Sequence, residues 1–444
     1  MQLSPEIISA IMLGGILAGV LTGFPLALAI GGVAFWAGIF LFGPDITFEV
    51  FYFRCYDMLN NYVLLAVPGF VLMGAVLEHS GAAEGVFEEL YVWFAGLRGG
   101  LAIATIILGT IVAATVGVIA ASVTLLTLTA LPAMVKRGYD KSLAAGAVCA
   151  GGSLGILIPP SIMLVIYGPM ADVSAGRMLV AAIVPGLFLS CSYCLYILVR
   201  CMLKPEIAPA IPHGEKRYSF LVKTRRLVVA TGPLAVLILA VLGSIFFGIA
   251  SPTEAAGVGS LATILVAAGN RRLNLNLLKT AGLTTVKVSG MVLLIGLLAS
   301  SFTGIFMRAN CDQAVSDFIL GMPGSRWGAF AIIMVICFAL GFFIDWLGIL
   351  FIMVPIITPI GAALKFDPLW FAMMICINLQ MSFMTPPFAY AIFYLRGAVD
   401  PALGVSTRDV IRGIIPYVIL IAISLVIFIR WPEIILWLPR KMYV

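Results

Sequence analysis

The stretch GGSLGILIPPSIML, Gly151 to Leu164, lies inside a long apolar run but contains three glycines, two serines and two adjacent prolines. Proline has no backbone N–H, and its ring clashes with the carbonyl four residues back, so two in succession break an α-helix. Hydrocarbon cannot satisfy the backbone groups that such a break frees, so polar neighbours must do so. The stretch therefore predicts a broken helix near the middle of a membrane.

The composition agrees with a membrane protein. Of the 444 residues, 62% are hydrophobic and 10% are charged, with a mean hydropathy of +1.15, whereas about 25% of the residues of a soluble domain are charged. Strands of a membrane barrel would alternate polar and apolar residues, which these runs do not. The chain is predicted to be an all-α polytopic membrane protein. Four runs approach or reach the about 20 apolar residues of a membrane-spanning helix: 7–21, 27–42, 227–247 and 411–429.

A second copy of the break occurs in the other half of the chain, in NLQMSFMTPPFAYA, Asn378 to Ala391. In each half an Asp precedes the Pro pair by nineteen residues, and an Arg further on precedes another Pro by eight. Four landmarks in the same order indicate an internal duplication. They are Asp140, Pro159, Arg177 and Pro185 in the first half, and Asp367, Pro386, Arg408 and Pro416 in the second.

The orientation follows from the basic segment Arg200–Arg226, which the positive-inside rule places in the cytoplasm. Counting crossings outward from it gives the two copies opposite orientations, and gives ten crossings with both termini in the periplasm. The apolar stretches 99–135 and 327–363 must each begin and end on one side, so both are predicted to be re-entrant hairpins. Residues 85–98 and 274–287 are predicted to be amphipathic helices on the inner surface.

This reasoning predicts inverted repeats with two re-entrant hairpins and two broken helices. The expected parts are N-terminal scaffold helices (1–60), a first inverted repeat (61–200, with hairpin 99–135 and broken helix 142–170), a cytoplasmic basic loop (201–226), scaffold helices with a surface helix (227–287), and a second inverted repeat (288–444, with hairpin 327–363 and broken helix 368–398).

Polar side chains and freed carbonyls at both breaks are predicted to form a site for substrate and cation, because broken-helix ends present carbonyls to Na⁺ and N–H groups to anions. The side chains are those of Ser153, Ser161, Asn378, Gln380, Ser382 and Thr385. The alternative for either break alone is a kinked structural helix. Asp345, in GFFIDWLGILF at the second hairpin tip, either binds a cation or orients the tip by hydrogen bonds.

Other motifs have structural explanations. Ser251 and Glu254 form a predicted capping box, which leaves Glu254 without a catalytic role. Ser122 and Thr124, near the first hairpin tip, can bond to the preceding helical turn. The sequence contains two histidines and no Walker A motif, nucleophile elbow or dinucleotide fingerprint, so an enzyme is not predicted. The net charge of +6 is explained by membrane orientation rather than by nucleic-acid binding.

The motifs VKRGYDKSLAAGAVCAGGSLGILIPPSIMLVIYG, SPTEAAGVGSLA and DWLGILFIMVPIITPI, with INLQMSFMTPPFAYAIFYLRG, resemble the large membrane (M) subunit of the tripartite ATP-independent periplasmic (TRAP) transporters. The resemblance extends from about residue 63 to residue 439. The last motif is most similar to the branch associated with 2-oxo acids, lactate, mannitol and chloroaromatic acids.

The resemblance implies an elevator-type transporter of the ion transporter superfamily, with Na⁺ as coupling ion and no other cofactor. It also implies two partners besides the lipid bilayer: a small membrane subunit of about four helices and a periplasmic substrate-binding protein. Many relatives have Gly-Ser-Ser at the first tip, where this chain has Gly117, Val118 and Ile119. This departure leaves Ser122 as the local candidate for a hydroxyl ligand.

The family's positions, together with the breaks, give two predicted sets of site residues. The Na⁺ set is Ser122, Gly151, Gly152, Ser153, Asp345, Asn378, Gln380 and Thr385. The substrate set is Ser153, Pro159, Pro160, Ser161, Ser382, Thr385 and Pro386.

The predicted function is Na⁺-coupled import of an organic acid across the bacterial inner membrane, with the substrate received from the binding protein. The alternative is a stand-alone ion-coupled carrier of organic anions that needs no binding protein.

Overall fold

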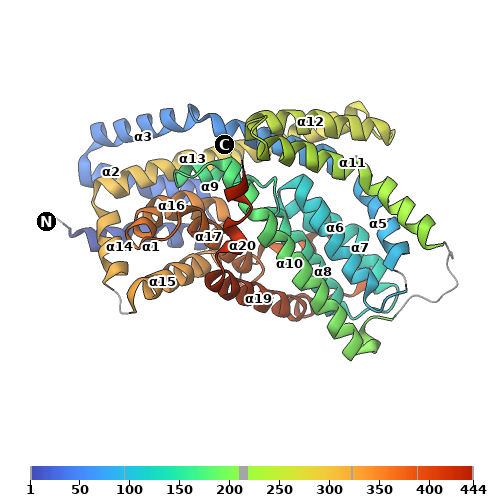
Figure 1. Ribbon diagram of the computed structural model, residues 1–444. Helices are drawn as coiled ribbons and strands as arrows, with labels where there is room; N and C mark the ends of the chain where they lie inside the picture. The colour runs from blue at the N-terminus through green and yellow to red at the C-terminus, as the bar shows by residue number, and fades with distance from the viewer. Residues whose placement is uncertain (1–2, 95, 210–218, 322–323, 388, 443–444) are drawn as a thin grey trace.

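The chain folds into helices joined by short loops (Figure 1). The computed structural model describes residues 3–94, 96–209, 219–321, 324–387 and 389–442, and none of these residues is in a β-strand. The predicted all-α fold class is therefore confirmed.

One group of helices forms a scaffold along one side of the molecule, where α3, α13, α12 and α11 follow the upper edge in Figure 1. Within it, α13 packs against α2, α3 and α4, and α12 packs against α4 and α11. The scaffold consists of α1 (Pro5–Leu21), α2 (Leu26–Phe42), α3 (Pro44–Leu59), the 3-10 turn η1 (Tyr62–Leu65), α4 (Ala66–Glu78), α5 (Ala82–Phe94), α11 (Phe220–Phe246), α12 (Pro252–Gly269), α13 (Leu275–Arg308) and α14 (Cys311–Leu320).

The two copies of the repeat form a second body, which we call the repeat body. Its first copy contains α6 (Gly100–Val116), α7 (Ile119–Val135), α8 (Lys141–Ser153), η2 (Leu154–Ile156), α9 (Ile162–Met170) and α10 (Ala175–Leu203). Its second copy contains α15 (Ser325–Leu340), α16 (Trp346–Ala363), α17 (Pro368–Ser382), α18 (Tyr390–Ala398) and α19 (Thr407–Arg430). The chain ends with α20 (Glu433–Leu436) and a 3-10 turn, η5 (Pro439–Lys441); two further turns are η3 (Pro205–Ile207) and η4 (Pro401–Leu403).

The duplication is visible in the helix boundaries. Helix α7 begins at residue 119 and α16 at 346, while α8 begins at 141 and α17 at 368, so both pairs begin 227 residues apart. The two acids that precede the Pro pairs have the same role. Asp140 accepts a hydrogen bond from the N–H of Leu143 at 2.9 Å, and Asp367 accepts one from the N–H of Trp370 at 3.0 Å. Each caps the helix that precedes a break. Both Pro–Pro bonds, 159–160 and 386–387, are cis.

Five described helices are long and apolar enough to cross a membrane unaided: α10, α11, α13, α16 and α19. The bent pair 44–59 and 62–78 counts as a sixth if the two helices form one span, and six further apolar helices are shorter. Short helices are what a protein with hairpins and broken spans requires. The ten crossings and the periplasmic placement of both termini remain predictions.

The prediction of a separate surface helix at 274–287 is wrong. Helix α13 is continuous over 34 residues, from Leu275 to Arg308. Nothing between 280 and 290 ends a helix: there is no proline, and Gly282 and Gly290 only weaken it. The predicted boundary at 287 therefore falls inside one scaffold helix.

For the other two surface segments, the structure differs less from the prediction. The inner helix expected at 85–98 is α5, Ala82–Phe94. In the basic segment, α10 continues to Leu203 and α11 begins at Phe220; Glu215, Lys216 and Arg217 lie outside the described residues.

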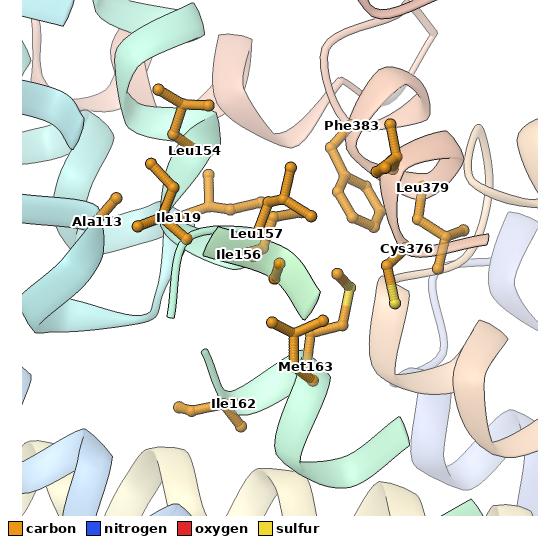
Figure 2. Packing of buried hydrophobic residues seen from close by; sticks show 14 of the residues in the cluster. Ala113, Ile119, Leu154, Ile156, Leu157, Ile162, Met163, Cys376, Leu379 and Phe383 are labelled. Carbon is orange, nitrogen blue, oxygen red and sulfur yellow. The ribbon is translucent and has the colours of Figure 1, made fainter. Parts of the chain in front are cut away.

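The first break lies in the apolar core of the repeat body. Figure 2 shows Ile156 and Leu157 between Ile119 of the first hairpin and Leu379 and Phe383 of the second broken helix. The side chains of Leu154, Ile156 and Leu157 are at most 1% exposed. The core thus holds the two breaks together, one from each copy.

Candidate functional site

The two broken helices meet through Ser153 and Gln380. The Gln380 Nε2 donates to the Ser153 Oγ at 3.4 Å, and this hydroxyl donates to the Ala150 carbonyl at 2.9 Å. These positions are also 227 residues apart, so each is the counterpart of the other in the duplication. A contact between equivalent residues marks the place where the axis relating the two copies passes.

Gln380 brings an unpaired acceptor to this centre. Its side chain is fully buried, and its Oε1 has no hydrogen-bond partner among the described residues. A buried carbonyl oxygen without a donor is costly, at about 1–3 kcal/mol. It is also the type of oxygen that binds a hard cation.

The first hairpin tip packs against the first break. The Ser122 Oγ donates to the Val118 carbonyl at 3.1 Å, which is the structural role considered for this hydroxyl. The same oxygen lies against Gly155: a Cβ there would be 3.0 Å away. Gly117, with φ of 67°, turns the tip, and a Cβ on it would lie 2.8 Å from the Pro160 carbonyl oxygen. Ser122 is therefore beside the break, with its hydrogen already donated.

Gly151 and Gly152 have a packing role. A Cβ on Gly152 would lie 2.4 Å from the Val123 side chain, and a Cβ on Gly109 of α6 would lie 2.7 Å from the backbone of Gly151. The first hairpin and α8 approach so closely only because side chains are absent there. This explains why both positions are glycine, and the role of their carbonyls as Na⁺ ligands stays a prediction.

In the remainder of the first break, Ser161 is fully buried and its hydroxyl donates to the Ile156 carbonyl. Pro159 and Pro160 are buried beside it. All three residues lie along the interruption, and the hydroxyl hydrogen of Ser161 is used within it.

The second break uses its hydroxyls in the same way. The Ser382 Oγ donates to the Leu379 carbonyl at 2.7 Å, and the Thr385 Oγ1 to the Met381 carbonyl at 2.9 Å. Pro386, next to Thr385, is exposed. Asn378 points elsewhere: its Nδ2 donates to the Met334 carbonyl of α15 at 2.7 Å. Asn378 therefore joins the second hairpin to α17 and is not part of the Ser153–Gln380 contact.

Asp345 caps the start of α16 at the second hairpin tip. It makes no side-chain capping bond to the second or third helical residue, but lies beside the Trp346 N–H. It is within electrostatic range of Tyr390 and Tyr394 on α18. The second tip thus faces the second half of the second broken helix, with a carboxyl group that has no counterpart at the first tip.

A cavity of about 450 Å³ lies between the scaffold and the repeat body, which we call the inner cavity. Its scaffold wall is α4 and the first half of α13, including Thr280 and Thr284; its other wall is the first hairpin tip and Tyr394. Sequence reasoning did not predict Tyr394, Thr280 or Thr284. Two signals were available in the sequence. Tyr394 lies in the first two helical turns after the second break, and Thr280 and Thr284 are four residues apart, so they lie on one face of a helix.

A second cavity of about 390 Å³ separates the same two bodies, and we call it the outer cavity. Its scaffold wall is α3, η1 and the second half of α13, including Ser300 and Thr303; its other wall is α9 and α16, including Pro169 and Phe351.

The two cavities are counterparts under the duplication. The inner one is lined by α7 and α18, and the outer one by α16 and α9, which are the equivalent helices with the copies exchanged. Thr284 and Thr303 are nineteen residues apart on α13, about 28 Å of helix. One scaffold helix therefore borders a cavity at each end, with the Ser153–Gln380 centre in the repeat body.

Such an arrangement, with inverted repeats, hairpins and broken helices, defines a secondary-transporter fold. Within the described residues no group of three or more His, Cys, Asp or Glu side chains is placed to hold a metal ion. Any cation at the breaks would depend on carbonyl, amide and hydroxyl oxygens.

Comparison with known proteins identifies the family. Residues 13–434 match the model of the tripartite ATP-independent periplasmic transporter, DctM component. The chain belongs to this family and is a multi-pass membrane transporter of the large-permease type, not an enzyme.

Curated relatives agree over nearly the full length. The C4-dicarboxylate TRAP transporter large permease protein DctM of Pseudomonas aeruginosa is 29% identical over 90% of this chain and 92% of its own. The sialic acid large permease SiaM of Vibrio cholerae is 26% identical, over 93% and 98%. The ectoine large permease TeaC of Halomonas elongata is 25% identical, over 97% and 98%.

Two solved structures share the fold. The YdaH transporter of Alcanivorax borkumensis superposes with a TM-score of 0.64 at 15% identity, covering 88% of this chain and 90% of its own. MtrF of Neisseria gonorrhoeae gives 0.58 at 14%, covering 97% and 95%.

Proposed function

We propose that this chain is the permease subunit of a Na⁺-coupled importer of an organic acid. The observation that carries the proposal is the pair of cavities between the same two bodies, lined by equivalent helices of opposite copies. A body with inverted symmetry can fit its partner equally well in two positions. A movement of the repeat body along the scaffold would widen one cavity and narrow the other, which is alternating access by an elevator movement.

The cation role is proposed for the centre where the breaks meet. Gln380 Oε1 is buried and unpaired, and Ser153 Oγ lies beside it. A Na⁺ ion there would satisfy the amide oxygen and offset the charge of a carboxylate substrate close by. Coupling follows because each ion lowers the cost of burying the other, so that the two are carried together.

The substrate class is proposed to be a small carboxylate. The named relatives include permeases for C4-dicarboxylates and sialic acid, which are acids, and for ectoine. The proposed partners are a small membrane subunit and a periplasmic binding protein that delivers the acid. The finer branch of 2-oxo acids, lactate, mannitol and chloroaromatic acids stays a prediction.

The test is uptake into proteoliposomes that contain both membrane subunits, with the binding protein outside. We expect accumulation of the acid bound by that protein when Na⁺ is higher outside, and none when K⁺ replaces Na⁺. Equal uptake in both salts would contradict the Na⁺ coupling. Unchanged uptake without the binding protein would instead favour the stand-alone carrier.

The elevator movement has a separate test. Ala121 and Thr284 line opposite walls of the inner cavity, on the repeat body and the scaffold. In a chain whose native cysteines are replaced, we expect a cross-link between Ala121→Cys and Thr284→Cys, made with a bismaleimide that contains a disulfide, to stop uptake and a reductant to restore it. Full uptake by the crosslinked protein would contradict movement between these bodies.

A further inference from the structure

Arg54 of α3 lies in the outer cavity and also in an adjoining one of about 550 Å³, so one guanidinium serves both. Asp57 and Met307 are shared in the same way. We call the joined space the outer cleft. One part of it lies between the scaffold and α9, at the end of the repeat body where α9 leads into α10, and the other part lies between α3 and α13 within the scaffold.

The position of this end follows from α10. Helix α10 has 29 residues, about 43 Å of helix, so its ends lie on opposite sides of the membrane. Its last turn leads into the basic segment that begins at Arg200, while its first turn follows α9. The outer cleft is therefore on the side opposite the basic segment, which is the periplasmic side by the positive-inside rule.

The packing of Arg54 is specific. Its side chain lies across Gly304 of α13: a Cβ there would be 3.0 Å from the Arg54 Nε and 3.3 Å from its Cγ. Any side chain at position 304 would displace the arginine. The glycine leaves room for the guanidinium in the gap between α3 and α13, away from the exposed face of α3 where Tyr52 and Tyr56 stack.

The adjoining cavity also contains Glu49 and Arg308, and Arg308 lies over the Phe42 ring, but the two charged groups that both cavities share have no partner in the described part of the chain. Among the described residues, neither Arg54 nor Asp57 makes a salt bridge or a side-chain hydrogen bond, although they are three residues apart on one helix. Other arginines do have partners: Arg440 pairs with Glu433 at 2.6 Å, and Arg396 donates to the Val405 carbonyl at 2.6 Å. A half-buried guanidinium without a partner is a binding group for an anion.

Neutral donors lie next to it. The Asn61 Oδ1 accepts from the Val63 N–H at 3.1 Å, which leaves the amide NH₂ as a donor. Ser300 lines the same cavity and has no side-chain hydrogen bond among the described residues. A carboxylate that pairs with the guanidinium finds further donors on both scaffold helices.

We propose that the outer cleft is a receiving site, in which Arg54 binds the carboxylate of an incoming acid before the repeat body takes it up. The inference rests on the proposed function and adds a site outside the helix breaks. A guanidinium pairs with a carboxylate through two parallel hydrogen bonds. Asp57 and Glu49 balance the charges of Arg54 and Arg308 in the empty cleft, so the acid is held weakly and can move on.

The first test does not depend on transport. The purified permease is treated with phenylglyoxal, which modifies arginine, and modification of each arginine peptide is followed by mass spectrometry. We expect sodium acetate to slow the modification of Arg54 several-fold more than sodium chloride of equal ionic strength, with Arg440 unaffected by the choice of anion. Equal rates for Arg54 in acetate and chloride would overturn the proposal.

The second test uses the proteoliposomes with the radiolabelled acid that gives Na⁺-dependent uptake. Arg54→Gln should raise the KM about tenfold, equivalent to about 1.4 kcal/mol, with the maximal rate retained. Arg440→Gln is the charge-matched control and should change neither. A loss of maximal rate with unchanged KM would assign Arg54 a structural role and overturn the receiving site. Absence of uptake by the unsubstituted protein concerns the proposed function only, and the labelling result then decides about Arg54.

Discussion

The two copies of the repeat hold equivalent helices together by different means. In the first, α6 and α8 touch through Gly109 and Gly151, where a single added Cβ would lie 2.7 Å from backbone atoms. In the second, α15 and α17 are joined by the amide of Asn378, the counterpart of Gly151, which donates to the Met334 carbonyl. The first copy uses close packing, and the second a polar side chain.

The same difference recurs at the other equivalent positions. Ser153 is matched by Gln380, and Val118 of the first tip by Asp345 of the second. The second copy therefore carries the longer polar side chains, while the first supplies small residues and backbone. The duplication accounts for the shared shape of the two halves of the site, and divergence accounts for the longer polar side chains of the second copy. Substitutions in the first copy should damage folding, and those in the second should damage ion coupling.

The largest effect is expected for Gly109→Ile, which gives the first copy the residue found at the equivalent position, Ile336. The side chain would have to enter the space of the Gly151 backbone, so no folded protein should accumulate. Gly109→Ala should lower stability by about 1–3 kcal/mol, measured as thermal unfolding in detergent. Gly14→Ala, where nothing lies within 4 Å of the added Cβ, is the control and should not destabilise. Equal stability of the two alanine variants would contradict close packing in the first copy.

Asp345→Val, which gives the second tip the chemistry of the first, should reduce Na⁺-dependent uptake at least tenfold. Asp345→Asn should also impair it, since the amide keeps the shape but loses the charge. Both proteins should still insert in the membrane, as measured by their yield in the membrane fraction. Unchanged Na⁺ dependence in both variants would remove Asp345 from the site.

Gln380→Leu should raise the Na⁺ concentration for half-maximal uptake several-fold, because it removes the unpaired Oε1. Its stability without Na⁺ should be close to that of the unsubstituted protein, since a buried acceptor without a donor is lost together with one long hydrogen bond. Removal of Na⁺ should lower the unfolding temperature of the unsubstituted protein but not that of the variant. An equal response of both proteins to Na⁺ would show that Gln380 is not a ligand. Ser153→Ala is the matched change in the other copy.

The smallest effects are expected at the two helix caps. Asp140→Ala and Asp367→Ala should each cost about 1 kcal/mol, the usual value for an N-cap. The two losses should be similar and additive in the double variant, because each side chain accepts one N–H at about the same distance. Thermal unfolding measures both. A loss of stability in only one variant would show that the two copies are equivalent in their backbone but not in this capping contact.

The sequence predicted the broken helices and hairpins because prolines, glycines and apolar runs act locally. The capping box at Ser251 and Glu254 is confirmed for the same reason: the Ser251 N–H donates to Glu254 at 2.7 Å. The separate helix at 274–287 was wrong because hydropathy falls there without any residue that ends a helix. An amphipathic pattern shows which face of a helix is apolar, but it does not show where that helix begins or ends.

The sequence by itself determined the membrane class, the inverted duplication and the family, since hydropathy, spacing and motifs are properties of short stretches. Only the tertiary structure decided that Ser153 meets Gln380, that Asn378 turns to α15, and that Arg54 lies across Gly304. These contacts join residues up to 250 positions apart, as Arg54 and Gly304 are. They depend on how closely helices approach, and that distance is set by the side chains of both partners together.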